Sequence, residues 1–343
     1  MQNRRPAFWF SSGIGLLLLC LLANLSVGSV WIPFGEIVGR FFGNPFSKES
    51  WETIFISYRI PKAFTAILAG IGLSWSGLQM QTFFRNPLAG PYVLGISSGA
   101  GLGVAVLLMA ATAFGFSIGT SGFGTWSVVI AASIGAIGVL LLVSLVAWRV
   151  RDSMTLLIVG LMFGSAVSAL VAVLSYFSDA EQLKLFTIWS MGSLGATQDA
   201  QLPAMGTAVV IGSIPLLLHI KAYNAMLMGE NYAASMGIRI QNLRWAMILS
   251  TGILAGSVTA FCGPIAFIGI AVPHMARLVF KTADHRVLFP ASALIGAIAL
   301  LVCDGISQLP GSALTLPINA VTSLVGAPMV IWLILRRNFS REF

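Results

Sequence analysis

Long apolar stretches alternate with short polar connections along almost the whole chain. Charged residues, proline or glycine bound these stretches, which fall at residues 9–31, 62–82, 91–112, 125–147, 154–176, 203–220, 244–262, 264–280, 287–304 and 319–335. They are apolar around the whole helical circumference, unlike a helix at a protein surface in water, which has a polar face. Because a membrane-spanning helix needs about 20 apolar residues, the pattern predicts about ten transmembrane helices. The chain is thus expected to be an all-α polytopic membrane protein with a single domain over residues 1–343.

Two boundaries in this pattern depend on few residues. Arg4 and Arg5 before an apolar run are also typical of a signal peptide, but the run continues past Val30 without a convincing cleavage site. We therefore interpret it as the first helix. The seventh and eighth stretches are separated only by Gly263 and Pro264, residues that commonly end a helix.

Composition agrees with lipid as the main solvent. Only 9% of the residues are charged and 57% are hydrophobic, whereas a soluble domain carries about 25% charged residues. The 36 glycines suit close helix contacts in a membrane. Cys20, Cys262 and Cys303 lie within or at the ends of apolar stretches and form no C-x-x-C pair. We interpret them as packing residues rather than disulfides or metal ligands.

Basic residues predict the orientation of the helices. If the N-terminus is cytoplasmic, the outer segments hold only five of the 19 Lys and Arg residues, namely Arg40, Lys48, Arg59, Lys62 and Lys184. Such an excess of Lys and Arg is typical of cytoplasmic segments. Both termini are therefore expected in the cytoplasm. The net charge of +8 reflects this topology and does not indicate a nucleic-acid partner.

No catalytic or energy-coupling group is visible in the predicted membrane interior. Asp304 is the one acidic residue near a span, at the outer end of the ninth, whereas ion-coupled carriers commonly place such groups at mid-membrane. The sequence contains no Gly-Lys dipeptide and hence no phosphate-binding loop. His219, His274 and His285 lack partners at metal-ligand spacing. We expect no enzyme activity, metal or cofactor in this chain.

The connection at residues 221–244 is too polar to span and too apolar for a solvated linker. Residues 225–228 and 233–236 are expected to form two short helices, separated by Gly229 and ended by Gly237. Exposed Met, Leu and Ala there would suit docking of a partner protein. The alternative is a helix lying on the lipid surface.

Arg59 and Lys62 enter the second span on the side where positive charges are otherwise scarce. They could anchor lipid headgroups or bind an acidic partner.

Four segments, in the same order, resemble the FecCD-type permeases of iron-siderophore, haem and cobalamin importers. They are residues 59–103 (which include RNPLAGP), the segment MLMGENYAASMGI, residues 263–297 beginning GPIAFIGIAVPHMARL, and residues 324–337, LVGAPMVIWLILRR. The resemblance implies a type II ABC importer permease in the bacterial inner membrane. Its implied partners are a second permease copy, two cytoplasmic ATPase subunits that use ATP and magnesium, and an extracytoplasmic substrate-binding protein.

The resemblance also implies roles for individual residues. The ATPase-coupling element would contain Leu227, Gly229, Ala233, Ala234 and Gly237. The docking positions for the binding protein would be Arg59, Lys62 and Gln308. The inner translocation gate would be lined by Asn86, Leu88, Ser153 and Met154.

Three positions depart from the family pattern at the outer side. Lys62 and Gln308 stand where the family has arginine, and Thr315 stands where it has the glutamate of ELPxG. Lysine cannot reproduce the bidentate contact of arginine with a carboxylate, so the docking charges differ here. The predicted function is import of an iron chelate, a siderophore or haem, with cobalamin as the alternative cargo. A self-contained secondary carrier is the less favoured alternative, because the membrane interior lacks charge.

Overall fold

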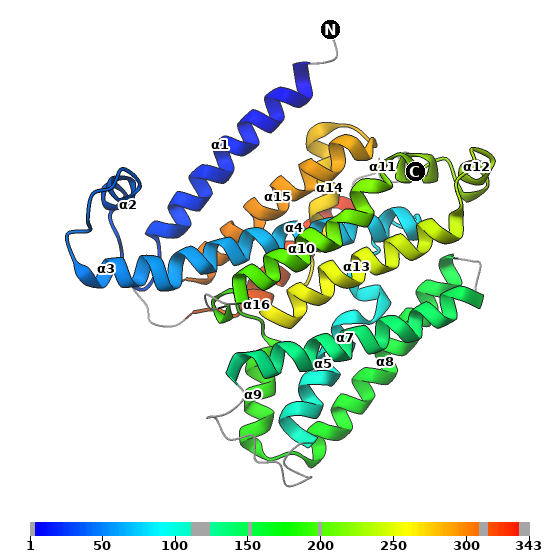
Figure 1. Ribbon diagram of the computed structural model, residues 1–343, viewed down its shortest axis with the longest axis horizontal. Helices are drawn as coiled ribbons and strands as arrows, with labels where there is room; N and C mark the ends of the chain where they lie inside the picture. Colours follow the sequence, from blue (N-terminus) through cyan, green and yellow to red (C-terminus); the bar gives the residue numbers. More distant parts are fainter. Residues whose placement is uncertain (1–3, 111–123, 150–152, 198–200, 309–314, 336–343) are drawn as a thin grey trace.

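The computed structural model describes residues 4–110, 124–149, 153–197, 201–308 and 315–335, and that part of the chain is helical without strands (Figure 1). Seven helices in it are long and apolar enough to cross a membrane, and three shorter apolar helices accompany them. The long ones are α1 (Arg4–Ser26), α4 (Ile60–Phe84), α7 (Gly124–Arg149), α8 (Ser153–Phe177), α10 (Gln201–Leu218), α13 (Ile240–Cys262) and α15 (His285–Ser307). The shorter ones are α5 (Ile96–Ala105), α14 (Ile268–Phe280) and α16 (Ile318–Leu335).

Each apolar stretch of the sequence therefore corresponds to one of these helices. The division at Gly263 is confirmed, because α13 ends at Cys262 and α14 begins at Ile268. The expected end of the first span at residue 31 is wrong, since α1 ends at Ser26. The Ser26 hydroxyl donates to the carbonyl of Ile32 at 2.7 Å, and this bond holds the chain in a turn after the helix.

Apart from the short helices of the 221–244 connection, three further helices of the described residues lie outside the apolar stretches. They are α2 (Phe34–Phe41), α3 (Glu49–Ile54) and α9 (Ala180–Ser190). A π-helical turn, Phe55–Arg59, joins α3 directly to α4. Hydropathy could not predict these helices, because they are too short to span and carry polar residues on one side.

Helix α4 lies at the centre of the helix bundle and packs against α1, α10, α13, α14 and α15. Two of these contacts bring backbones together. A Cβ atom on Gly77 would lie 1.7 Å from the carbonyl oxygen of Gly269 in α14, and one on Gly70 would lie 2.2 Å from that of Gly296 in α15. In lipid, such close van der Waals packing is a main source of helix association.

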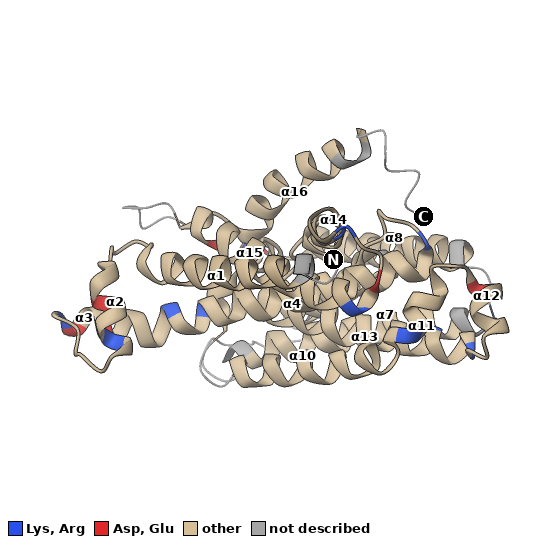
Figure 2. Cartoon of the chain, turned by 90° about the horizontal axis from the view of Figure 1, so that it is seen from above, with Lys and Arg blue, Asp and Glu red and all other residues tan. Residues whose placement is uncertain are grey.

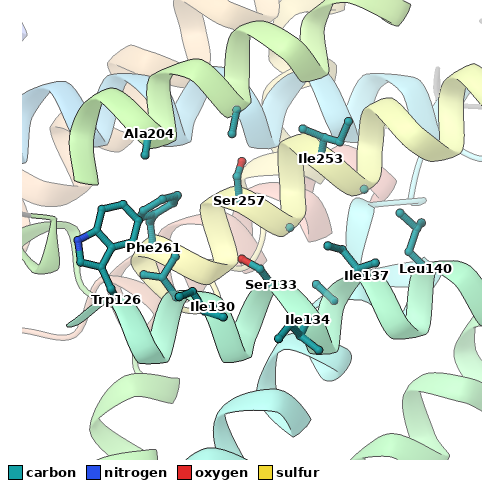
Figure 3. Close-up of a pocket in the computed structure, with 15 residues that line it drawn as sticks. Trp126, Ile130, Ser133, Ile134, Ile137, Leu140, Ala204, Ile253, Ser257 and Phe261 are labelled. Atoms are coloured by element: carbon teal, nitrogen blue, oxygen red, sulfur yellow. The ribbon is translucent and has the colours of Figure 1, made fainter. Parts of the chain in front are cut away.

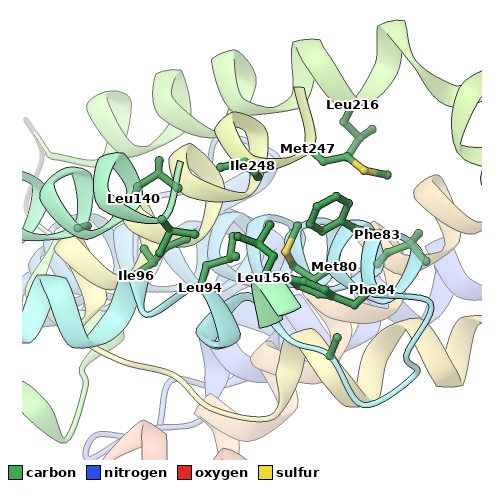
Figure 4. Close-up of a cluster of buried hydrophobic side chains, with 14 of the residues drawn as sticks. Met80, Phe83, Phe84, Leu94, Ile96, Leu140, Leu156, Leu216, Met247 and Ile248 are labelled. Carbon is green, nitrogen blue, oxygen red and sulfur yellow. The ribbon is translucent and has the colours of Figure 1, made fainter. Parts of the chain in front are cut away.

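A second group of helices packs beside this centre. Helix α5 lies against α7 and α8, and α7 also packs against α13. The larger apolar cluster fills the space where the two groups meet, as Figure 4 shows. Its labelled members are Met80, Phe83, Phe84, Leu94, Ile96, Leu140, Leu156, Leu216, Met247 and Ile248.

We predict that Gly77→Ala destabilises the protein, because its methyl group would overlap the backbone of α14. Overpacking of this kind costs about 1–3 kcal/mol. Thermal unfolding in detergent, followed with a thiol-reactive dye that reports exposure of the buried Cys262 and Cys303, should show a lower midpoint. Gly138→Ala is the matched control, since nothing lies within 4 Å of a Cβ at that exposed position. Equal midpoints for the two variants would contradict the close α4–α14 contact.

Candidate functional site

Charged residues gather at the two ends of the long helices (Figure 2). One end carries α2, α3 and the beginning of α4. The opposite end carries two short helices, α11 (Ile220–Met226) and α12 (Glu230–Ser235). The candidate functional regions lie at these ends, with α4 running from one toward the other.

The two short helices predicted in the polar connection are present, although each begins a few residues earlier than expected. Gly229 separates them with φ of 106°, and Gly237 follows the second with φ of 85°, a region of backbone conformation that favours glycine. Met228, Tyr232 and Met236 are exposed to 69%, 48% and 61%. The segment therefore presents large apolar side chains on its outer surface.

Tyr223 fixes α11 to the helices beneath it. Its side chain is fully buried, and its hydroxyl donates to Gln79 Oε1 at 2.7 Å. Gln79 Nε2 in turn donates to Ser250 Oγ at 2.9 Å, and Ser250 donates to the carbonyl of Gly212 at 2.6 Å. This buried chain of hydrogen bonds connects α11 with α4, α13 and α10.

Asn224 makes a second set of bonds from the same helix. Its Nδ2 donates to Asp284 Oδ1 at 2.6 Å, and its Oδ1 accepts from the backbone N and from Nδ1 of His285, both at 2.8 Å. His285 Nδ1 therefore carries a proton, and Nε2 lies 2.9 Å from Thr82 Oγ1 of α4. Asn224 thus ties α11 to α15 directly and to α4 through the imidazole ring.

The second short helix is attached through an ion pair. Glu230 at the start of α12 accepts from Arg244 Nη2 of α13, at 2.9 and 3.0 Å for its two oxygens. The Arg244 side chain is almost fully buried, and its guanidinium carbon lies 6.0 Å from the centroid of the Phe83 ring in α4. Arg244 thus connects α12 with two membrane-length helices, α13 and α4.

The five predicted coupling residues divide into two groups. Gly229 and Ala233 are buried and Leu227 is half-buried, so they pack toward the protein. Ala234 and Gly237 are exposed, and nothing lies within 4 Å of a Cβ on Gly237. Only the second group is available to contact a partner, whereas the first group sets how closely α12 approaches the spans.

The loop after α4 adjoins this segment. Arg85 ends α4 with φ of 48°, and its Nη1 lies 3.7 Å from the position of a Cβ on Gly229. Asn86 Oδ1 accepts from the backbone N of Leu88 at 2.9 Å, and the carbonyl of Pro87 accepts from His274 Nε2 of α14 at 2.8 Å. The loop is therefore fixed at both sides, and the side chain of Leu88 is 40% exposed.

The predicted gate is brought together only in part. Asn86 and Leu88 lie in this loop, next to the α11–α12 segment. Ser153 and Met154 begin α8, but their side chains lie outside the described part of the structure. Their joint role in a gate stays a prediction.

A polar network occupies the opposite end of α4. Asp304 of α15 is buried, and its carboxylate contacts Lys62 Nζ at 2.9 Å, Gln308 Nε2 at 2.7 Å and Asn24 Nδ2 at 3.0 Å. Arg59 is also buried, and its guanidinium donates to the carbonyls of Leu25 and Val30. The network joins α1, α4 and α15.

The predicted docking positions therefore have internal partners in this conformation. Arg59 is 7% exposed, and the side chain of Lys62 is 21% exposed. Lys62 and Thr315 line a pocket of about 300 Å³ between the ends of α4, α15 and α16. Docking of a partner at Arg59, Lys62 and Gln308 stays a prediction. Sequence reasoning missed Asn24, and although Asp304 stood out as an isolated acid, nothing in the sequence identified its partners.

The histidines and cysteines show no metal-ligating arrangement in the described residues: no group of three or more His, Cys, Asp or Glu side chains there could hold a metal ion. Cys20, Cys262 and Cys303 are free thiols.

The sequence of this chain matches those of membrane transport proteins along almost its whole length. The sequence model of the FecCD transport family matches residues 16–336. The chain is 34% identical to the hemin transport system permease protein HmuU of Yersinia pestis over 326 residues, which cover 95% of this chain and 96% of that protein. It is also 34% identical to the vitamin B12 import system permease protein BtuC of Salmonella arizonae over 335 residues, covering 98% and 96%.

Solved structures agree with these sequence matches. A metal-chelate type ABC transporter in an inward-facing conformation superposes with a TM-score of 0.82 and 28% identity, covering 96% of this chain and 99% of that one. PsaBC from Streptococcus pneumoniae in complex with Fab has a TM-score of 0.54 at 16% identity, covering 89% and 98%. At 16% identity, the match to PsaBC supports similarity of the fold alone.

The ion pair between Lys62 and the buried Asp304 is expected to contribute to stability. Lys62→Met should destabilise the protein by about 2 kcal/mol, because Asp304 stays buried without its cation; the partial exposure of Lys62 keeps the loss below that of a fully buried pair. The double variant Lys62→Met with Asp304→Leu should recover only part of that loss. It removes both charges, but the buried amides of Asn24 and Gln308 lose the Asp304 carboxylate as acceptor. The thermal midpoint in detergent measures both effects. A double variant less stable than Lys62→Met would show that Asp304 is needed independently of Lys62.

Proposed function

Because the chain belongs to the FecCD transport family, it is the membrane permease of an ABC importer, and we propose that its cargo is a bulky metal chelate. Similarity along almost the whole chain to permeases named for hemin and vitamin B12 carries this proposal. Within this class we favour an iron chelate, a siderophore or haem, with cobalamin as the alternative.

The proposed partners follow from the two ends of the molecule. Two cytoplasmic ATPase subunits, which hydrolyse ATP with magnesium, would bind the α11–α12 segments of two permease copies paired as a homodimer. A substrate-binding protein would dock at the opposite end, near α2 and the pocket beside Lys62. The exposed Met228, Tyr232 and Met236 support the first assignment, since large apolar side chains outside the membrane-length helices suit a protein interface.

The proposed location is the bacterial inner membrane with both termini in the cytoplasm. The excess of Lys and Arg in the segments on the side of α11 and α12 supports this orientation.

The bonds of α11 and α12 provide a route from ATP hydrolysis to the membrane. Movement of an ATPase subunit against Ala234 would displace α12, and Glu230 would transmit the displacement to Arg244 and α13. Tyr223 and Asn224 would carry α11 with α4 and α15. Arg85 at the end of α4 adjoins the same segment, so the loop with Asn86 and Leu88 would move with it and change the inner opening.

Transport in a defined system tests the proposed function. The chain is reconstituted in liposomes with the ATPase and binding protein from neighbouring genes, and uptake of hemin, a ferric siderophore and cobalamin is measured. We expect uptake of one chelate, dependent on both ATP and the binding protein. Uptake by the permease alone, driven by an ion gradient, would instead indicate a secondary carrier.

A charge on the exposed face of α12 should uncouple the complex. We predict that Ala234→Glu, and separately Gly237→Trp, lowers substrate-stimulated ATP hydrolysis at least about tenfold, because an unpaired charge or a bulky ring in a close contact costs more than about 1.4 kcal/mol. Ala7→Glu is the matched control, because Ala7 is exposed near the beginning of α1, away from α12 and from the proposed docking region for the binding protein. Undiminished stimulation in the two α12 variants would refute the docking assignment.

Replacement of Asn224 should weaken the coupling between ATP hydrolysis and the spans, because it removes hydrogen bonds that attach α11 to α15. Asn224→Leu keeps similar volume but removes three hydrogen bonds to Asp284 and His285, each with a net value of about 1 kcal/mol. We expect a lower thermal midpoint and a smaller ratio of stimulated to basal ATP hydrolysis. Asn44→Leu, at an exposed position after α2, is the control for stability and should leave the thermal midpoint unchanged. If the ratio in Asn224→Leu equals that of the unmodified complex, α11 does not transmit the movement.

A further inference from the structure

A groove of about 470 Å³ lies between α7, α10 and α13 (Figure 3). Its walls come from two separate parts of the fold. Helix α7 belongs to the group that contains α5 and α8, whereas α10 and α13 pack against the central α4. The groove therefore follows the junction between the two helix groups.

Small residues make the groove possible. Helix α10 contributes Ala204 and Ala208, and α13 contributes Gly252, Gly256 and Ser257. Leu140 and Ala136 of α7 pack directly against Gly252 and Gly256, so α7 and α13 meet there and the small residues leave space beside this contact. That space is lined almost entirely by apolar atoms. The Ser257 hydroxyl donates to the carbonyl of Leu254 at 3.1 Å within its own helix, so it is not a free donor for a polar ligand.

The open side of the groove faces the surroundings of the helices. Ile130, Ile134 and Ile137 on α7 are exposed to 55%, 66% and 55% and border the opening. All three helices are of membrane-spanning length and hydropathy. The medium outside the groove is thus the hydrocarbon of the bilayer rather than water.

An aromatic pair closes one end. The rings of Trp126 and Phe261 meet edge to face with centroids 6.1 Å apart, and the Trp126 side chain is 41% exposed. Trp126 lies just after the beginning of α7, and Phe261 lies just before the end of α13. Tryptophan is enriched at the depth of lipid headgroups, so this end lies near the membrane interface and Leu140 near the deeper end.

We propose that the groove binds one acyl chain of a membrane phospholipid, with the headgroup beside Trp126 and the chain extending toward Leu140. The volume lies in the range of small-ligand sites. A transmembrane helix of a partner does not fit, because a cylinder of about 10 Å diameter and 30 Å length occupies roughly 2,400 Å³. A bound chain contacts both helix groups and fills the space between them.

Tryptophan fluorescence tests the site. The purified chain in detergent is titrated with phosphatidylcholine that carries bromine atoms on its acyl chains, which quench nearby tryptophans, and the Trp126 signal is defined by subtraction of Trp126→Phe. We expect saturable quenching of this signal. Ser257→Phe, which places a ring in the groove, should weaken the apparent affinity roughly tenfold, the effect of losing contact with about two methylene groups.

Gly15→Phe is the matched control, because Gly15 is exposed on α1, which does not line the groove, and nothing lies within 4 Å of its Cβ position. It should leave the titration unchanged. If Ser257→Phe is not monodisperse, Ala204→Leu on the opposite wall takes its place. Quenching that never saturates in the unmodified chain, or that saturates identically in the groove-filling variant, would overturn the proposal. Quenching that disappears as protein concentration rises would show that a second copy covers the groove, and would overturn it equally.

Discussion

The close approach of backbones at Gly70 and Gly77 determines how the other helices can be arranged around α4. Apolar side chains in a membrane gain little by leaving lipid, so helices associate through contact and hydrogen bonding. Glycine at these positions lets α15 and α14 lie against α4 without intervening side chains. The same closeness brings polar side chains of α4 within reach of partners: Gln81 donates to the carbonyl of Ile270 at 3.1 Å and accepts from Arg277 at 2.6 Å. Polar side chains of α4 can thus be buried, because groups on the neighbouring helices complete their hydrogen bonds.

The two functional ends are connected by this one helix. At the end near α2 and α3, Lys62 meets Asp304 of α15, and at the end near α11, Thr82 meets His285 at the beginning of the same α15. Helices α4 and α15 are therefore joined near both ends as well as at Gly70 in between. Helix α11 is bonded to α4 through Tyr223 and to α15 through Asn224. A displacement of α11 is therefore expected to move α4 and α15 together rather than one of them alone. Such a unit suits a permease whose energy comes from a separate subunit.

Residue patterns predicted the spans, because full-length apolar stretches are a strong signal in one sequence. They also predicted the break at Gly263 and the two short helices around Gly229, where glycine marks a local backbone requirement. Pairings between distant segments could not be predicted in this way: nothing near Asp304 identifies Lys62 as its partner, and nothing near Asn224 indicates His285. Helices α2, α3 and α9 were missed because they are too short to span a membrane and polar residues interrupt their apolar ones. The burial of Arg59 follows from the path of the chain between α1 and α3, which hydropathy does not encode.

The bonds of Tyr223, Asn224 and Glu230 lead us to expect that α11 and α12 move with α4 as one rigid unit. Pulsed electron paramagnetic resonance can test it with spin labels at the exposed Asn231 on α12 and Phe64 on α4, in complexes with one labelled permease copy and its native cysteines replaced. The account predicts the same distance distribution with and without bound ATP, while a label pair across the two copies changes its distance. A shift of the intrachain distance on ATP binding would show that α12 moves independently of the spans, and would contradict the account.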